Sequence, residues 1–489
     1  MYSLGIDLGS SSVKVSLLDI TSGLKAASAS YPKSEAPISS PQKGWAEQNP
    51  HDWWDYICRA CAEIKEQGFD FNRVRCVGIS YQMHGLVCLD SQGEVLRDAI
   101  IWCDSRAVEI GAEAFRSIGE QECLASTLNS PGNFTASKLA WVKQNEPEVY
   151  ARTAKFMLPG DYIAYRLSSE MTTTASGLSE GILWDFKKQQ PSGQVLAHYG
   201  IDRQLLADLV PSIGIQSRTS AWTRKILGIP EGTPISYRAG DQPNNAFSLN
   251  VLEPGEVAAT AGTSGVVYGV TDVPKADPQS RVNSFLHVSP SEQQRLGVLL
   301  CINSVGIMNS WLRKQVCPDL SYPEMNELAA SAPVGSDGLL VLPFGNGAER
   351  MLCGDSPGAK IVGLDCVRHS RAHLVRAVQE GIAFSFRYGI DIMRAMGLNM
   401  SVMRAGYANM FLSPVFRKTL ASLCDSHIEL LDTDGSLGAA RAAALGAGLY
   451  GSSEEAFASL KSLETVTPDS AWAEPLEQAY RRWKAQLEK

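Results

Sequence analysis

Apolar residues flank a short Gly/Ser turn at the very start of the chain. Ile6 and Leu8 precede the Gly-Ser-Ser-Ser turn at residues 9–12, and Val13, Val15 and Leu17 follow it. An apolar run that is divided by a Gly/Ser cluster is typical of a β-hairpin. The pattern therefore predicts strands at residues 4–8 and 13–18, with a third strand at 24–31.

Strand and helix periods then alternate along most of the chain. Asn49 and Pro50 are in the cap and first positions of an amphipathic helix, and a strand at residues 74–80 leads into the polar loop 81–85. The segment 177–185 is predicted to be a loop with Trp184 buried. The alternation predicts a layered α/β fold.

A second hairpin pattern follows the first by some 250 residues. Strands predicted at 257–260 and 266–270 enclose the turn formed by Gly262, Thr263, Ser264 and Gly265. A repeat of this kind suggests two copies of one α/β unit. We therefore expect two domains, at residues 1–245 and 246–489, with a central cleft between them.

Composition narrows the class of function. With 489 residues and 44% hydrophobic content, the chain can bury more than one core. The net charge of -8 argues against nucleic acid or an anionic membrane as the main partner. Eleven cysteines, of which Cys58 and Cys61 are the closest pair at helical spacing, do not indicate a disulfide framework, and no signal peptide is visible. We expect a cytoplasmic protein that acts on small molecules.

Asp7 is the first candidate for chemistry, because a carboxylate interrupts an apolar strand there and needs a partner. A metal ion is one candidate partner. Gly9 allows a positive φ angle, while Ser10, Ser11 and Lys14 offer hydroxyls, successive N–H groups and a cation for a phosphate. The alternative is a Gly/Ser hairpin with a solvated Asp7.

Asp241 is the second candidate, at the end of a strand predicted at residues 234–239 and just before a helical run. Its structural alternative is a helix N-cap. With the ordinary pKa of a carboxyl group, about 3.9, Asp241 is ionised near pH 7 and can take a proton from a hydroxyl group that attacks phosphorus. Phosphoryl transfer otherwise needs Mg²⁺ and N–H groups directed at the phosphates.

The order of several motifs adds a resemblance. The segments GIDLGSSSVKVSLLD, SYQMHG, IIWCDSR, FTASKLAWVKQNEPE, LPGDY, AGDQ, TAGTSGVVY and LGAARAAALGAG together resemble the FGGY carbohydrate kinases, from the first strand to about residue 450. The resemblance implies two actin-like, hexokinase-like domains of the RNase H type that close on a sugar and ATP. Within the family, the motifs are most similar to those of the members that phosphorylate D-xylulose.

The resemblance also implies roles for single residues. Asp241 matches the catalytic base, and Asp7 would act with the Mg²⁺-nucleotide, either directly or through water. The implied sugar-binding residues are Gln82, Met83, His84, Trp102, Asp104, Arg106, Asp241 and Gln242. The implied nucleotide-binding residues are Gly9, Ser10, Ser11, Lys14, Gly262, Thr263, Ser264, Asn409 and Ser413. Two structural alternatives stay open. Asp104 and Arg106 could pair with each other, and His84 could make only a backbone hydrogen bond.

Four departures from the family pattern affect these expectations. A glycine triplet of the family aligns with Ala408, Asn409 and Met410, and the family's GERTP loop is replaced by Gly-Ala-Glu-Arg-Met at residues 347–351. Gln242 replaces an Asn, and Thr174 and Gly177 replace Asp. The last changes lie on the sugar side, so they weaken the identity of the sugar more than that of the reaction.

The expected function is ATP-dependent phosphorylation of D-xylulose at its 5-hydroxyl, with Mg²⁺ and an Asp base. One alternative is a kinase for another sugar or polyol, such as L-ribulose, L-fuculose or glycerol. An alternative from another class is a non-catalytic, sugar-responsive binding protein on a kinase scaffold, although such a protein would need neither Asp7 nor Asp241. The resemblance also implies a homodimer.

Overall fold

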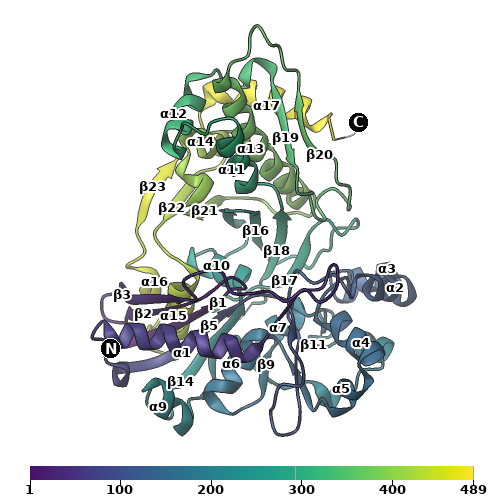
Figure 1. Ribbon diagram of the computed structural model, residues 1–489, viewed down its shortest axis with the longest axis vertical. Helices are drawn as coiled ribbons and strands as arrows, with labels where there is room; N and C mark the ends of the chain where they lie inside the picture. Colours follow the sequence, from purple (N-terminus) through teal and green to yellow (C-terminus); the bar gives the residue numbers. More distant parts are fainter. Residues whose placement is uncertain (292, 488–489) are drawn as a thin grey trace.

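Two β-sheets form the centres of two lobes in this computed structural model, which describes residues 1–291 and 293–487 (Figure 1). The first sheet has the order β13-β14-β5-β1-β2-β3. Its strands are β1 (Tyr2–Leu8), β2 (Val13–Asp19), β3 (Lys25–Tyr31), β5 (Val74–Tyr81), β13 (Ile213–Arg218) and β14 (Pro234–Gly240). We call this sheet and the elements packed on it the first lobe.

The second lobe is built on a seven-stranded sheet with the order β17-β18-β16-β15-β21-β22-β23. Its strands are β15 (Glu256–Ala261), β16 (Gly265–Thr271), β17 (Asn283–Leu286), β18 (Leu296–Ile302), β21 (Val402–Gly406), β22 (Ile428–Leu431) and β23 (Ser462–Val466).

The two sheets share one five-strand arrangement. In the first lobe β3, β2 and β1 are antiparallel, and β5 and β14 continue in parallel with β1. In the second lobe β18, β16 and β15 are antiparallel, and β21 and β22 continue in parallel with β15. The predictions of both hairpins and of two copies of one α/β unit are therefore confirmed.

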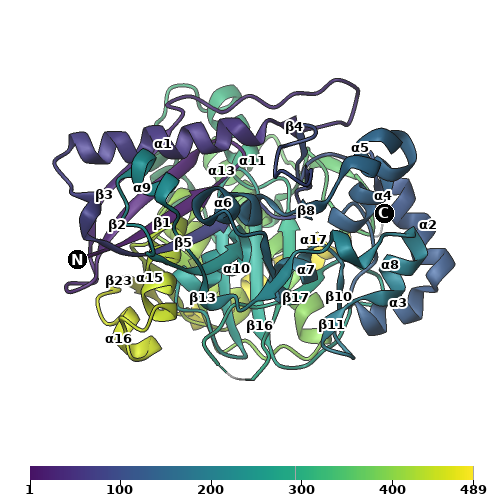
Figure 2. The same ribbon diagram turned by 90° about the horizontal axis from the view of Figure 1, so that it is seen from below.

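Helices α10 (Asp241–Ser248) and α15 (Gly435–Gly446) pack against each other, and α10 contacts both sheets (Figures 1 and 2). Helix α15 comes late in the chain but lies on β1 and β5 of the first sheet. Small residues permit this close packing: a Cβ atom at Gly5 would lie 1.8 Å from the Ser436 carbonyl oxygen, and one at Gly78 would lie 2.1 Å from that of Ala439. The Ser3 hydroxyl also donates to the Ala440 carbonyl oxygen, at 2.6 Å.

The outer faces of the sheets are covered by longer helices. Helix α1 (Pro50–Glu66) begins as predicted, with the Asn49 side chain accepting a hydrogen bond from the His51 amide at 3.0 Å. Helix α1 packs on β2 and β3, and α6 (Pro159–Ser168) on β5 and β14. In the second lobe the corresponding cover is α13 (Arg371–Ala395), which packs against α14 (Pro414–Cys424) and α17 (Ser470–Lys484).

The remaining helices lie around these two cores. They are α2 (Val108–Ile118), α3 (Glu120–Ser126), α4 (Thr135–Asn145), α5 (Pro147–Arg152), α7 (Ala175–Glu180), α8 (Gly193–Tyr199), α9 (Ala221–Leu227), α11 (Gly306–Gln315), α12 (Tyr322–Ser331) and α16 (Ser453–Phe457). Short ribbons complete the fold: β4 (Glu47–Gln48) with β7 (Ala99–Ile100), β6 (Val87–Leu89) with β8 (Lys155–Met157), β9 (Thr172–Thr174) with β12 (Asp208–Val210), β10 (Trp184–Asp185) with β11 (Gln190–Pro191), and β19 (Leu340–Phe344) with β20 (Gly358–Val362).

One sequence prediction is wrong and one is right in the segment 177–185. The segment is not a loop throughout, because α7 ends at Glu180; the Thr174 hydroxyl caps this helix by accepting a hydrogen bond from the Gly177 amide. Trp184 is buried, as expected. The division at residues 245 and 246 stays a prediction, and α15 shows that a late segment packs on the first sheet. In the described part of the chain, no helix combines the length and apolar character needed to cross a membrane.

Candidate active site

Asp7 lies at the carboxyl end of β1, opposite Ser80 of the parallel strand β5. Its Oδ1 atom accepts a hydrogen bond from the Ser80 hydroxyl at 2.7 Å. Its other oxygen, Oδ2, lies 2.3 Å from the position that a Cβ atom would take at residue 435, so only glycine fits there. Burial raises the pKa of Asp7, the charge of Asp434 adds to this rise, and Ser80 and Lys14 oppose it.

Asp434 is a site residue that the sequence analysis missed. It caps α15, and its Oδ2 atom pairs with the Lys14 ammonium at 2.7 Å. Although burial acts to raise the pKa of Asp434, the bonds from Lys14, Ser436 and the Leu437 amide hold it below its usual value. The pair ties the hairpin formed by β1 and β2, the predicted phosphate site, to the start of α15. Only the capping role was visible as a sequence signal.

Asp241 is the first residue of α10, and Gly240 occupies the N-cap position. The alternative of Asp241 as the N-cap is therefore wrong. The expectation of an unshifted pKa is also wrong, because burial and the charge of Asp7 raise the pKa of Asp241 to about 7. Bonds from Gln242 oppose this rise only in part. A carboxyl group with this pKa is half ionised at neutral pH, which suits a general base.

The loop after β5 presents His84 in a defined tautomer. His84 has a φ angle of 63°, and its Nδ1 atom lies 2.9 Å from the Glu180 carbonyl oxygen. A carbonyl oxygen only accepts, so Nδ1 carries the hydrogen and Nε2 is left as an acceptor. Burial and the positive charges of Lys138 and Arg350 lower the pKa of His84 to about 3, so the ring is neutral. The backbone bond predicted as the alternative is present, and Nε2 stays available.

Lys138 fixes the ends of two loops behind His84, and the sequence analysis assigned it no role. Its ammonium is fully buried and donates to the carbonyl oxygens of His84, at 2.8 Å, and Ile101, at 3.0 Å. Burial lowers the pKa of Lys138 to about 7, although the Asp104 carboxylate opposes this. Its position in the middle of an apolar helix face was the only sequence signal.

Three other predicted sugar-binding residues lie around this loop. Met83 is buried, with its Cγ atom 2.5 Å from the position of a Cβ atom at Gly240. The Gln82 amide donates to Gln48 at 3.0 Å. The buried Oε1 atoms of Gln82 and Gln242 have no hydrogen-bond partner among the described residues. These two acceptors are free for a hydroxylated ligand.

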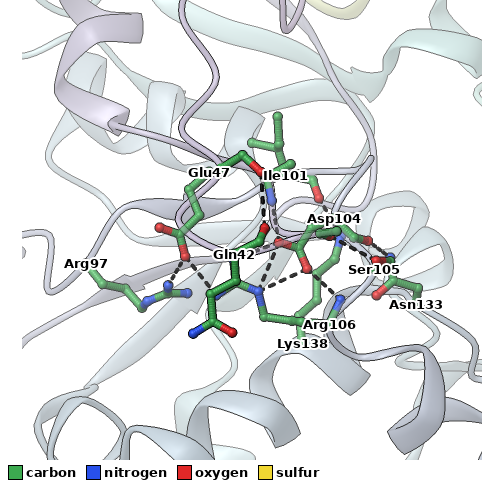
Figure 3. A network of polar contacts seen from close by, with 12 residues as sticks. Gln42, Glu47, Arg97, Ile101, Asp104, Ser105, Arg106, Asn133 and Lys138 are labelled. Carbon is green, nitrogen blue, oxygen red and sulfur yellow. Dashed lines mark hydrogen bonds and ion pairs between the residues drawn. The ribbon is translucent and has the colours of Figure 1, made fainter.

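Trp102 is exposed, and its indole N–H donates to the Ser10 hydroxyl at 3.3 Å. It therefore joins the predicted sugar-binding stretch to the first phosphate turn. Asp104 and Arg106 are placed differently: both side chains are buried, and they pair at 2.7 Å (Figure 3). The alternative in which these two residues pair with each other is confirmed.

The Asp104 and Arg106 pair belongs to a larger network (Figure 3). Asp104 also accepts a hydrogen bond from the Ala46 amide at 2.6 Å, and Arg106 pairs with Glu47 at 2.7 Å. The Arg106 guanidinium lies 3.8 Å from the ring centroid of Trp45 and 4.8 Å from that of Trp141. The geometry gives these residues the role of holding the loop before α1.

The second lobe brings three side chains toward the sugar-binding loop. Arg350 lies with its guanidinium 5.0 Å from the ring centroid of Phe134, which packs edge-on against His84 at 4.6 Å. Burial and the nearby Glu349 carboxylate raise the pKa of the Cys301 thiol well above its usual value, and Glu349 also lies near Arg350. The sequence analysis noted residues 347–351 only as a departure from the family, because no local pattern reveals a contact between lobes.

The two phosphate turns differ from the expectation in detail. The first turn closes with the Gly9 amide donating to the Ser12 carbonyl oxygen at 3.0 Å, and Gly9 is not among the described residues with a positive φ angle. In the second turn Thr263 and Ser264 are exposed, and the Gly306 amide donates to the Gly262 carbonyl oxygen at 2.8 Å. Each turn therefore contains an exposed hydroxyl group, that of Ser11 in the first turn and those of Thr263 and Ser264 in the second.

A cavity of about 890 Å³ opens beside the second turn. Its lining includes Gly262, Thr263, Tyr322, Asn326, Asn409 and Ser413. Asn409 has a φ angle of 54°, so an asparagine occupies a left-handed position that glycine adopts more easily. The Ser413 hydroxyl is committed to the Gln379 side chain at 2.7 Å and to the cap of α14. The volume suits a nucleotide.

The carboxylates fit a magnesium ion that is shared with phosphate. Within residues 1–291 and 293–487, no group of three His, Cys, Asp or Glu side chains could hold a metal ion by itself. Mg²⁺ is ordinarily held by one or two carboxylates together with water and substrate phosphates. Asp7, with Asp434 near it and the predicted phosphate turn at residues 9–12 adjacent, meets this requirement.

Comparison with known proteins identifies the family. The sequence model for the N-terminal domain of the FGGY family of carbohydrate kinases matches residues 2–248, and the model for the C-terminal domain matches residues 257–447. The chain belongs to the FGGY carbohydrate kinases. This FGGY kinase is therefore an enzyme that phosphorylates a sugar, and its family implies ATP as the phosphoryl donor.

Several relatives of this FGGY kinase span almost its whole length. A xylulose kinase of Bacillus subtilis strain 168 is 29% identical over 464 residues, which are 93% of this chain and 90% of the relative. A xylulose kinase of Escherichia coli strain K12 is also 29% identical, over 100% of this chain and 99% of the relative. The crystal structure of xylulose kinase from Rhodospirillum rubrum is 26% identical, with a TM-score of 0.91 over 100% of this chain and 98% of that one. The predicted two-domain fold of the actin-like, hexokinase-like type is confirmed.

Proposed function

We propose that this FGGY kinase transfers the γ-phosphoryl group of ATP to the 5-hydroxyl of D-xylulose and that Asp241 is the general base. The observation that carries the proposal is the Asp241 carboxyl group, which begins α10 between the two sheets and has a pKa of about 7. The full-length similarity to xylulose kinases supports the choice of sugar.

In the proposed reaction, the 5-hydroxyl oxygen attacks the γ-phosphorus as its proton passes to the Asp241 carboxylate. A bond forms between the sugar oxygen and phosphorus, and the bond from phosphorus to the bridging oxygen breaks, leaving its electron pair on ADP. The neutral His84 ring accepts a hydrogen bond from a sugar hydroxyl at Nε2. The Oε1 atoms of Gln82 and Gln242 accept hydrogen bonds from other hydroxyls.

The nucleotide is proposed to lie in the cavity beside Gly262 and Thr263, with its phosphates between the two turns. Ser10, Ser11 and Lys14 approach the phosphates from the first lobe, and Asp7 holds Mg²⁺ directly or through water. A bound Mg²⁺ neutralises phosphate charge. Asn409 contacts the nucleoside in place of a glycine, whereas Ser413 acts through its backbone because its hydroxyl is already bonded.

A coupled assay of ADP release over a panel of sugars tests the proposal. D-xylulose is expected to give the highest kcat/KM, with L-ribulose, L-fuculose and glycerol below it. If one of these other sugars gives a higher kcat/KM, it is the substrate in place of D-xylulose, and the proposed reaction type is unchanged. The departures from the family pattern at Thr174, Gly177 and Gln242 are the reason for testing this alternative. Absence of ADP release with every sugar would refute the proposed function and restore the binding-protein alternative. The homodimer stays a prediction, for which size-exclusion chromatography with light scattering is the test.

A further inference from the structure

Glu180, the last residue of α7, carries a carboxyl group inside the first lobe. The residue is only 2% exposed, and its Oε1 atom has no hydrogen-bond partner among the described residues. The fully buried guanidinium of Arg238 does not neutralise it, because that group pairs with Asp161 at 3.0 Å. A carboxylate without a cation or a full set of donors is strongly disfavoured at such a position.

The side chain and the main chain of Glu180 reach two different parts of the site. Its Oε2 atom lies 2.5 Å from the position of a Cβ atom at Gly240, the residue before Asp241. Its carbonyl oxygen accepts the hydrogen bond from His84 Nδ1. Glu180 therefore contacts the turn that carries the proposed base and also fixes the ring that faces the sugar.

The charged and titratable groups around Glu180 come from every element packed against it. They are Tyr81 of β5, His84 of the following loop, Lys138 of α4, Asp161 of α6, Arg238 of β14, Asp241 of α10 and Tyr268 of β16. Burial raises the pKa of Glu180 well above its usual value; Asp241 and Asp161 add to the rise, and hydrogen bonds to its carboxyl group from the Tyr81 side chain and the His84 backbone oppose it. Because burial disfavours the charged form of Glu180 and the charge of Asp241 adds to this effect, Glu180 is expected to keep its proton when Asp241 is ionised.

We propose that Glu180 is a positioning residue whose side chain supports the Gly240–Asp241 turn as an uncharged carboxylic acid, while its main-chain carbonyl holds the His84 ring. The inference rests on the proposed role of Asp241 as the base. The Glu180 side chain fills the space behind Asp241 and keeps water from that side of it. Removing this side chain admits water, which favours the charged form of Asp241.

Two substitutions of Glu180 separate a neutral, space-filling role of its side chain from a role of its negative charge and from no role in catalysis. Glu180→Gln keeps the size and the neutral charge, so kcat is expected to stay within about fivefold of wild type and the acid limb of the kcat–pH profile is expected not to move. Glu180→Ala is expected to lower kcat by about 30-fold or more, to leave the KM for ATP unchanged, and to move the acid limb about one pH unit lower. Glu170→Gln, at an exposed position just after α6, is the matched control.

The inference is overturned if Glu180→Gln loses as much activity as Glu180→Ala, or if Glu180→Ala is as active as wild type with an unmoved limb. Glu180→Val replaces the alanine variant if that variant does not fold, because it also removes the carboxyl group and opens the space behind Asp241. The titration of Asp241 is also read from the pH dependence of the thermal midpoint, which needs no turnover and no particular sugar. An inactive wild type would refute the proposed function, while the midpoints of the variants would still decide the role of Glu180.

Discussion

Replacing Asp241 by asparagine is expected to slow catalysis strongly and to stabilise the free enzyme at alkaline pH. The loss of a positioned base lowers kcat by about 100-fold or more. The stabilisation arises because the pKa of Asp241 rises from 3.8 to about 7 on folding, so the folded state disfavours the charged form. At about 1.4 kcal/mol per pKa unit, three units give roughly 4 kcal/mol as an upper bound, and exposure of part of the group reduces this to about 2 kcal/mol.

The sign and the pH window follow from proton linkage. Below pH 3.8 the Asp241 carboxyl is protonated in both the folded and the unfolded state, and it contributes no pH-dependent cost. As pH rises toward about 7, the unfolded state binds fewer protons than the folded state, so the free energy of unfolding of wild type decreases. The asparagine side chain of the variant does not titrate, and the advantage of Asp241→Asn is therefore complete above about pH 7.

The assay compares the urea midpoints of wild type and Asp241→Asn at pH 5 and pH 8, without nucleotide or magnesium. All other titrating groups are common to the two proteins, so the difference between the two midpoint shifts isolates Asp241. An equal shift at both pH values, or a variant less stable at pH 8, would refute the electrostatic reasoning. Near-normal turnover would remove Asp241 from the role of base.

Three further substitutions test other parts of the site. Gly435→Ala places a Cβ atom 2.3 Å from Asp7 Oδ2, so it should displace this carboxylate and lower kcat by about 100-fold. Gly193→Ala is the control, because Gly193 has open space around it and kcat should stay unchanged in the same assay. Asp434→Asn keeps a good N-cap but loses the ion pair with Lys14. The KM for Mg-ATP should therefore rise about fivefold, while the KM for the sugar stays unchanged. An unchanged KM for Mg-ATP would argue against a phosphate-binding role for this pair. Arg106→Lys loses the buried ion pairs with Glu47 and Asp104 and the contact with the Trp45 ring, so it should lower the free energy of unfolding by about 3 kcal/mol in urea titrations. The KM for the sugar should stay unchanged. A tenfold rise in this KM at unchanged stability would instead make Arg106 a sugar contact.

Local patterns revealed the elements that depend on local chemistry. Both Gly/Ser/Thr hairpins and the Asn49 cap of α1 follow from residues that are adjacent in the sequence, and the structure contains them. Asp7 and Asp241 were also accessible, because a carboxylate at the end of an apolar strand is unusual. Their pKa values were not, since these depend on burial and on a charge more than two hundred residues away.

Residues whose role depends on distant partners escaped the sequence analysis. Asp434 has the sequence signature of a helix cap, and nothing local indicates that its partner is Lys14, 420 positions earlier. Glu180 ends a six-residue helix that lacks an apolar period, so the segment resembled a loop. Arg350 reaches Phe134 from the other lobe. In each case the information lies in the packing of separate elements.

The two proposed catalytic carboxylates are held by different elements, and this has a consequence for specificity. Asp7 is fixed by Ser80 of β5 and by the start of α15, whereas Asp241 is bounded by Gln242 and by Glu180 of α7. Substitutions on α7 and at Gln242, the second residue of α10, can therefore reshape the proposed sugar pocket, whereas the rest of α10 packs on α15 beside Asp7. Because Thr174, Gly177, Glu180 and Gln242 all lie on or beside these two helices, the family likeness supports the phosphoryl transfer more firmly than it supports D-xylulose.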